Sequence, residues 1–216
     1  MSDSTVHVYV FEGFADWEPA FATAGIHQPD FQREPGRWQV KTVGASPSAT
    51  VRSLGGLTVL PDLALDDLDP EHSRMLILPG GTGWEDRPDR HMPAVALALD
   101  FLARGVPVAA ICGATAGLAR AGALDERAHT SNALAYLKGT AYAGAAHYRD
   151  EPAVLDADLI TAGGMASLEF AREIFQLLRI YDAEVLEAWY QLNKTGRSEF
   201  FARMARASQA ATAEPA

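Results

Sequence analysis

The sequence predicts an α/β protein built around one central sheet. Short β-branched or apolar runs alternate along the chain with segments of helical spacing, which is typical of this class. Two of the runs, at residues 75–78 and 106–111, are apolar almost throughout, as expected for strands buried on both faces of a sheet. The 216 residues are 48% hydrophobic and 21% charged, which is enough for one sizeable core.

The N-terminal part of the chain predicts two strands, a helix, a hairpin and a loop. In order, these are a strand at 6–11, a helix at 18–24, a strand at 38–43, a hairpin at 51–59 and an acidic loop at 62–70. Asp16 is the expected N-cap of the helix and Gly25 its expected end. The pair Gly55-Gly56 suits the hairpin turn.

The central part of the chain predicts a strand, a glycine loop, a helix and a second buried strand. The strand at 75–78 leads into Pro79-Gly80-Gly81, a helix follows at 92–103, and the next strand at 106–111 leads directly into Cys112. A helix at 116–121 comes next. The only cysteine of the chain is therefore expected at a sharp corner between a strand and a helix.

The C-terminal part predicts mostly helices and no second domain. The expected elements are a short helix at 134–138, strands within 154–162, helices at 167–178 and 183–192, and a frayed tail at 205–216. We expect one domain at residues 1–182, followed by a C-terminal helical extension and tail at 183–216.

Composition excludes several classes of function. Acidic residues outnumber basic ones 28 to 18, giving a net charge of −10, so no nucleic-acid partner or anionic membrane surface is expected. The chain shows no secretory signal and no membrane-spanning run, which makes the cytoplasm the expected location. One cysteine cannot form an internal disulfide or a thiolate cluster, and no His or carboxylate spacing indicates a metal site. No cofactor is expected.

Cys112 is the candidate nucleophile. A corner between a strand and a helix exposes the side chain at its apex, and the helix N-terminus favours the thiolate by lowering the pKa of the thiol. The alternative is a small buried apolar residue, which is the common fate of an intracellular cysteine.

Glycine loops and one carboxyl group are expected around Cys112. The N–H groups of Gly81 and Gly113 are candidates for an oxyanion hole, because both follow strands whose carboxyl ends meet at one edge of the sheet. Glu18 is expected in the same crevice, where burial beside a thiolate would raise the pKa of its carboxyl group. The alternative for the glycine loop at Gly81 is a plain tight turn. The alternative for Glu18 is that its charge only compensates the helix dipole.

A histidine base is the weakest part of the expected site. His129 and His147 are the two candidates, because the other histidines fall within the first strand or in predicted loops. Neither candidate is adjacent to Cys112 in sequence.

Four motifs, taken together, resemble the ThiJ/PfpI superfamily. They are Met75-Leu-Ile-Leu-Pro-Gly-Gly, Ala109-Ala-Ile-Cys-Gly-Ala-Thr, Gly13-Phe-Ala-Asp-Trp-Glu and Ser167-Leu-Glu-Phe-Ala-Arg. His129-Thr-Ser-Asn and Glu151-Pro-Ala-Val are similar to the bacterial branch usually labelled class I glutamine amidotransferase-like. The resemblance implies a flavodoxin-like three-layer sandwich, with Cys112 on a nucleophile elbow and Glu18 hydrogen-bonded to its sulfur. It also implies a homodimer.

The sequence departs from several branches of that superfamily. Gly113 stands where the intracellular peptidases have a histidine, and no late His-x-Glu pair of a true glutaminase occurs, so neither activity is expected. Asn132 occupies the ungapped position of the histidine of the glyoxalase branch. An amide can bind a substrate oxygen but cannot carry protons, so Asn132, with Thr115, is a candidate for substrate binding.

These observations favour cysteine-dependent chemistry on a small-molecule substrate: a reactive carbonyl compound or a glycated adduct. One alternative is a redox sensor or stress chaperone without turnover, since a lone thiolate oxidises to an oxyacid rather than to an internal disulfide. Another is a protein that binds a small ligand noncovalently and in which Cys112 at the strand-to-helix corner no longer reacts.

Overall fold

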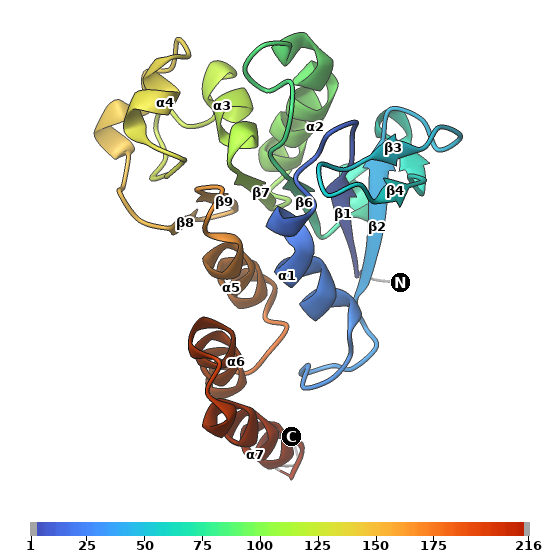
Figure 1. The fold of residues 1–216 in the computed structure, drawn as a ribbon, viewed down its shortest axis with the longest axis vertical. Helices are drawn as coiled ribbons and strands as arrows, with labels where there is room; N and C mark the ends of the chain where they lie inside the picture. The colour runs from blue at the N-terminus through green and yellow to red at the C-terminus, as the bar shows by residue number, and fades with distance from the viewer. Residues whose placement is uncertain (1–3, 214–216) are drawn as a thin grey trace.

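A seven-stranded sheet runs through the centre of the molecule in the computed structural model, which describes residues 4–213 (Figure 1). Its strands are β1 (Thr5–Tyr9), β2 (Gln39–Gly44), β5 (Leu63–Ala64), β6 (Met75–Leu78), β7 (Val108–Ile111), β8 (Ala153–Asp156) and β9 (Leu159–Ala162). The spatial order is β5-β2-β1-β6-β7-β9-β8, and every pair is parallel except β8–β9. The predicted hairpin is a separate antiparallel pair, β3 (Val51–Arg52) and β4 (Thr58–Val59).

Helices cover both faces of this sheet. The helices that the structure describes are α1 (Trp17–His27), α2 (Met92–Ala103), α3 (Gly113–Arg120), α4 (Leu134–Lys138), α5 (Ser167–Leu178), α6 (Ala183–Thr195) and α7 (Ser198–Ala213). Four 3-10 turns complete the described elements: η1 (Leu65–Asp67), η2 (Pro70–His72), η3 (Pro88–His91) and η4 (Gly144–His147). Together these elements form the predicted α/β sandwich, and α6 and α7 extend away from α5 (Figure 1).

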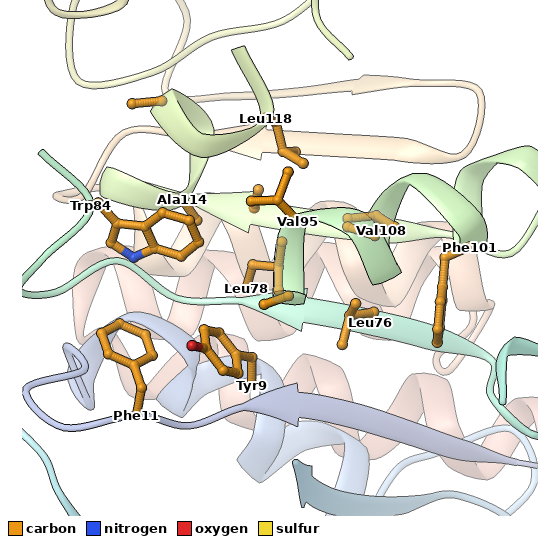
Figure 2. Packing of buried hydrophobic residues seen from close by; sticks show 14 of the residues in the cluster. Tyr9, Phe11, Leu76, Leu78, Trp84, Val95, Phe101, Val108, Ala114 and Leu118 are labelled. Carbon is orange, nitrogen blue, oxygen red and sulfur yellow. The ribbon is translucent and has the colours of Figure 1, made fainter. Parts of the chain in front are cut away.

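Side chains of the central strands point alternately to the two faces of the sheet and pack into two separate hydrophobic cores. Leu76 and Leu78 of β6 pack with α2 and α3 on one face, together with Trp84 and Phe101 (Figure 2). Met75 and Ile77 point to the other face, where α1, α5 and α6 lie. The strands are therefore buried on both sides, which explains why they have no polar alternation in the sequence.

The first helix runs through its expected stop. Gly25 lies inside α1, which continues to His27, because the missing side chain lets Phe175 and Tyr181 pack directly against the helix. Tyr181 Oη also donates a hydrogen bond to the Gly25 carbonyl oxygen at 3.0 Å. Asp16 occupies the predicted N-cap position of this helix, but its side chain makes no capping hydrogen bond, because Asp16 Oδ1 accepts the Gly55 N–H instead.

Two predicted irregular segments are ordered. The acidic loop at 62–70 contains the edge strand β5 and η1, and Asp62 Oδ2 accepts hydrogen bonds from Thr42 of β2. The tail expected to fray from residue 205 forms the helix α7 to Ala213, while residues 214–216 lie outside the described part. The buried side chain of Met204 anchors α7. No helix within residues 4–213 is long and apolar enough to cross a membrane.

Candidate active site around Cys112

Cys112 stands at the apex of a sharp turn between β7 and α3. Its φ of 58° and ψ of −123° lie in a region that side-chain-bearing residues rarely adopt. The Cys112 N–H donates to the Ala162 carbonyl oxygen of β9 at 2.9 Å, and α3 begins at the very next residue, Gly113. The helix therefore begins three residues earlier than expected, so its N-terminal N–H groups adjoin the thiol.

Glu18 lies beside the thiol and is only 1% exposed. The first turn of α1 places its carboxyl group within hydrogen-bond reach of Cys112, and its Oε2 accepts the Gly80 N–H at 2.6 Å. Burial raises the pKa of Glu18 to about 7, although both hydrogen bonds act in the opposite direction. Glu18 can therefore accept or release a proton near neutral pH.

The thiol itself does not have the low pKa expected from its place at a helix N-terminus. Burial raises the pKa of Cys112 to about 11, and the negative charge of Glu18 adds to the rise. Hydrogen bonds from the Asn132 side chain and the Gly113 N–H oppose this shift but do not cancel it. The desolvation of the sulfur and its carboxylate neighbour outweigh the helix dipole.

Asn132 connects the sulfur to the loop after β9. Its Nδ2 lies 3.4 Å from Cys112 Sγ as a donor, and its Oδ1 accepts the Gly164 N–H at 2.9 Å. The second bond fixes the amide orientation, so the side chain presents N–H and not oxygen to the sulfur.

Two glycines to which the sequence analysis gave no role, Gly80 and Gly164, pack directly against Cys112 and Glu18. A Cβ on Gly164 would lie 2.8 Å from Cys112 Sγ, and a Cβ on Gly80 would lie 2.7 Å from Cys112 Cβ. Either methyl group would collide with the reacting pair. The sequence signal was present: Gly163-Gly164 follows β9 directly, as Pro79-Gly80-Gly81 follows β6.

The two expected donors lie in different elements: Gly81 in the loop after β6, and Gly113 at the start of α3. The loop of Gly81 is held against Phe14 by backbone hydrogen bonds of the neighbouring residues, and within the described chain the Gly81 N–H has no acceptor. Gly113 packs against the indole of Trp84, where a Cβ would lie 2.7 Å from Cδ1.

Thr115, the second candidate for substrate binding, is fully buried and bonded within the protein. Its Oγ1 donates to the Cys112 carbonyl oxygen at 2.6 Å and lies 2.6 Å from Ser131 Oγ. Thr115 thus ties the elbow to the segment that carries Asn132.

The structure does not bring His129 or His147 to the sulfur. His129 is fully buried, with Nδ1 2.7 Å from the Arg127 carbonyl oxygen and Nε2 3.4 Å from Tyr142 Oη. Burial lowers the pKa of His129 and so favours the neutral ring. His147 lies in η4, and its carbonyl oxygen accepts the His129 N–H at 3.3 Å.

A pocket of about 530 Å³ opens beside Asn132 and Gly164. Residues 131–132, 151–152 and 163–166 form most of its wall, and Glu169 of α5 and Lys194 of α6 complete it. Asn132 and Gly164 link this space to the thiol, since both line the pocket and both lie next to the Cys112 sulfur.

Comparisons with known proteins agree with this arrangement. Residues 4–177 match the DJ-1/PfpI family. The chain is 39% identical over 204 residues to the "Uncharacterized protease YoaZ" of Bacillus subtilis, covering 93% of this chain and 96% of that one. It is also 30% identical over 132 residues to a deglycase, PH1704, of Pyrococcus horikoshii, covering 60% of this chain and 73% of the relative.

A solved structure shares the whole architecture. The thiJ/pfpI family protein of Bacillus anthracis superposes with a TM-score of 0.88 at 40% identity, covering 94% of this chain and 96% of that one. The match extends past residue 177, so the C-terminal helices belong to the shared architecture. With its elbow cysteine, its matched residues and these relatives, the chain belongs to the DJ-1/PfpI family.

Proposed function

We propose that the protein is a cysteine-dependent, cofactor-independent enzyme that acts on small reactive carbonyl compounds, such as 2-oxoaldehydes, or on their adducts. The observation that carries the proposal is the contact between the Cys112 thiol and the buried Glu18 carboxyl group, whose pKa is raised to about 7. Glu18 replaces the missing histidine as the base, because a base works best when its pKa lies near the working pH.

The first step is addition of sulfur to an aldehyde carbon. The S–C bond forms while the thiol proton passes to the Glu18 carboxylate. The Gly81 N–H stabilises the oxyanion, joined by the Gly113 N–H once the sulfur, bonded to carbon, no longer holds it. Return of the proton from Glu18 to that oxygen gives a hemithioacetal and restores the carboxylate. This route needs no free thiolate, which agrees with the raised pKa of Cys112.

Methylglyoxal is a suitable test substrate because its conversion to lactate needs only water. One carbon is oxidised while its neighbour is reduced, so no external oxidant or reductant takes part. The wild-type protein is expected to consume methylglyoxal and to form lactate, and Cys112→Ser to reduce the rate to background. Wild-type turnover no higher than that of Cys112→Ser would overturn the proposal.

We do not propose the protease activity that the name of the Bacillus subtilis relative suggests. A peptidase of the type with a histidine after its cysteine needs a side chain where Gly113 stands, and Trp84 fills the space of even a Cβ there. Redox sensing is favoured less because it depends on a thiolate, whereas the pKa of Cys112 is raised. Noncovalent binding of a ligand would make no use of the contact between the Cys112 thiol and the buried Glu18 carboxyl group, so it is favoured less.

The family resemblance also favours a homodimer. Trp17 and Phe21 expose apolar rings on α1, 51% and 39% respectively, and such side chains are suited to an interface. Sedimentation equilibrium is expected to give twice the chain mass, and a monomer would contradict this.

A further inference from the structure

The helix α6 forms part of the pocket that adjoins Cys112 through Asn132 and Gly164, although this helix lies beyond the residues 4–177 that match the family. Lys194 of α6 lines the pocket and donates through Nζ to Glu169 Oε1 at 2.6 Å. Tyr190, one turn earlier, donates to the same oxygen at 2.9 Å. Two side chains of α6 therefore fix the carboxylate of Glu169, whose side chain is only 15% exposed.

The ionisable groups of the pocket leave one negative charge uncompensated. Three such side chains line it, and the charges of Glu169 and Lys194 cancel in their ion pair. The carboxylate of the third, Glu151, has no hydrogen-bond or ion-pair partner in the part of the chain that the structure describes. Its charge also reaches Glu173, where it adds to the effect of burial in raising the pKa.

An anionic substrate would be disfavoured in two ways. It would be repelled by Glu151, and it would gain little from Lys194, whose positive charge is already neutralised by Glu169. A cationic group would gain from Glu151 without disturbing the ion pair. Beside these charges, Met165, which is 99% exposed, and Pro152 offer apolar surface to the rest of a small substrate.

We propose that α6 completes the substrate pocket and that the pocket selects carbonyl compounds carrying a positive charge over those carrying a carboxylate. This inference rests on the proposed function, because it assumes that the pocket beside Cys112 receives the substrate. Glu151 supplies the attraction, and Lys194 is a positioning residue that holds and neutralises Glu169.

The single cysteine allows the pocket charge to be measured without turnover. Two thiol reagents of similar size are used, the trimethylammonium-ethyl and the sulfonatoethyl methanethiosulfonate. In each case the Cys112 thiolate attacks the sulfenyl sulfur, an S–S bond forms, and methanesulfinate leaves. The ratio of the cationic to the anionic rate constant, divided by the same ratio for N-acetylcysteine, reports the local field.

The normalised ratio is expected to be about 10 or more in the wild-type protein, equivalent to about 1.4 kcal/mol. Glu151→Gln should lower it at least threefold, and Lys194→Gln should raise it by a similar factor because Glu169 loses its cation. Asp66→Asn is the matched control, since this exposed carboxylate lies in η1 at the opposite edge of the sheet. Asp66→Asn should change the ratio little. This control distinguishes the local charge of the pocket from the effect of the net charge of −10.

A wild-type ratio near 1, or equal effects of Glu151→Gln and Asp66→Asn, would overturn the charge selection. An unchanged ratio in a folded Lys194→Gln variant would overturn the role of α6. Absence of methylglyoxal turnover together with the expected ratios would instead overturn the proposed function and leave the charge selection standing.

Discussion

The buried clusters around His129 and around Cys112 both contain titratable side chains, yet they differ in kind. In the cluster of His129, both ring nitrogens have partners, and the rings of Tyr142 and Tyr148 pack edge-on at 5.5 and 5.8 Å. In the cluster of Cys112, two acids face one another, and the pKa of each is raised. A buried ionisable group thus indicates chemistry when its proton is shared with a neighbour, and a structural role when its bonds are complete.

Substitution of Glu18 is the strongest test of this difference between the two clusters. Glu18→Gln keeps the shape and the neutral hydrogen bonding of the side chain but removes the base, so kcat/KM for methylglyoxal should fall at least 100-fold. The wild-type rate should rise with pH through about 7 as Glu18 ionises, whereas the residual rate of the variant should lack this step. A pH-rate profile of both proteins measures this. A loss below tenfold would show that the proton goes elsewhere.

The same carboxyl group should control how stability depends on pH. Its pKa is about 7 in the folded protein and near 4.5 when exposed, so the folded state binds the proton more tightly. The contribution is fully present below pH 4.5 and is lost as the pH rises through 7. The difference of 2.5 units corresponds to about 3 kcal/mol.

Urea unfolding of the wild type and of Glu18→Gln at pH 5 and pH 8.5 would measure this loss. The wild type should lose more free energy of unfolding over this interval than the variant. Parallel pH dependence in the two proteins would show that burial of Glu18 has no such effect.

A substitution in the cluster of His129 should lower stability and leave activity almost unchanged. His129→Gln leaves the Arg127 carbonyl oxygen and Tyr142 Oη without their present partner, which should lower the free energy of unfolding by about 1–3 kcal/mol. The kcat/KM for methylglyoxal should stay within about twofold, because neither nitrogen reaches Cys112. A large loss of activity in a stably folded variant would show that the two clusters work as one.

The sequence predicted the elements that meet at the Cys112 cluster because their signals are local. An apolar strand followed by Cys112-Gly113 predicts the corner, and Glu18 at the start of a helix after another strand predicts its neighbour. The pKa of Cys112 could not be predicted in the same way. Its direction depends on how deeply the sulfur is buried and how near Glu18 lies, and both are set by contacts between distant segments.

The elements that sequence reasoning placed wrongly depend on tertiary packing. Gly25 indicates a helix end by itself, but Phe175 and Tyr181 need its missing side chain for close packing. The alanine-rich tail has too little apolar surface to predict order, yet α7 packs against α6 and buries Met204. In each case the deciding partner lies elsewhere in the fold, where local propensity gives no information.

The backbone conformation of Cys112 has a consequence for how the sequence can vary. A side-chain-bearing residue at φ 58° and ψ −123° costs on the order of 1–3 kcal/mol, and glycine would avoid most of that cost. Selection for stability alone would therefore favour the loss of this cysteine, and only selection for its chemistry would keep it. Within a set of descendants of this chain, a glycine at position 112 would mark lineages in which the thiol had lost its use, even where the fold had become more stable.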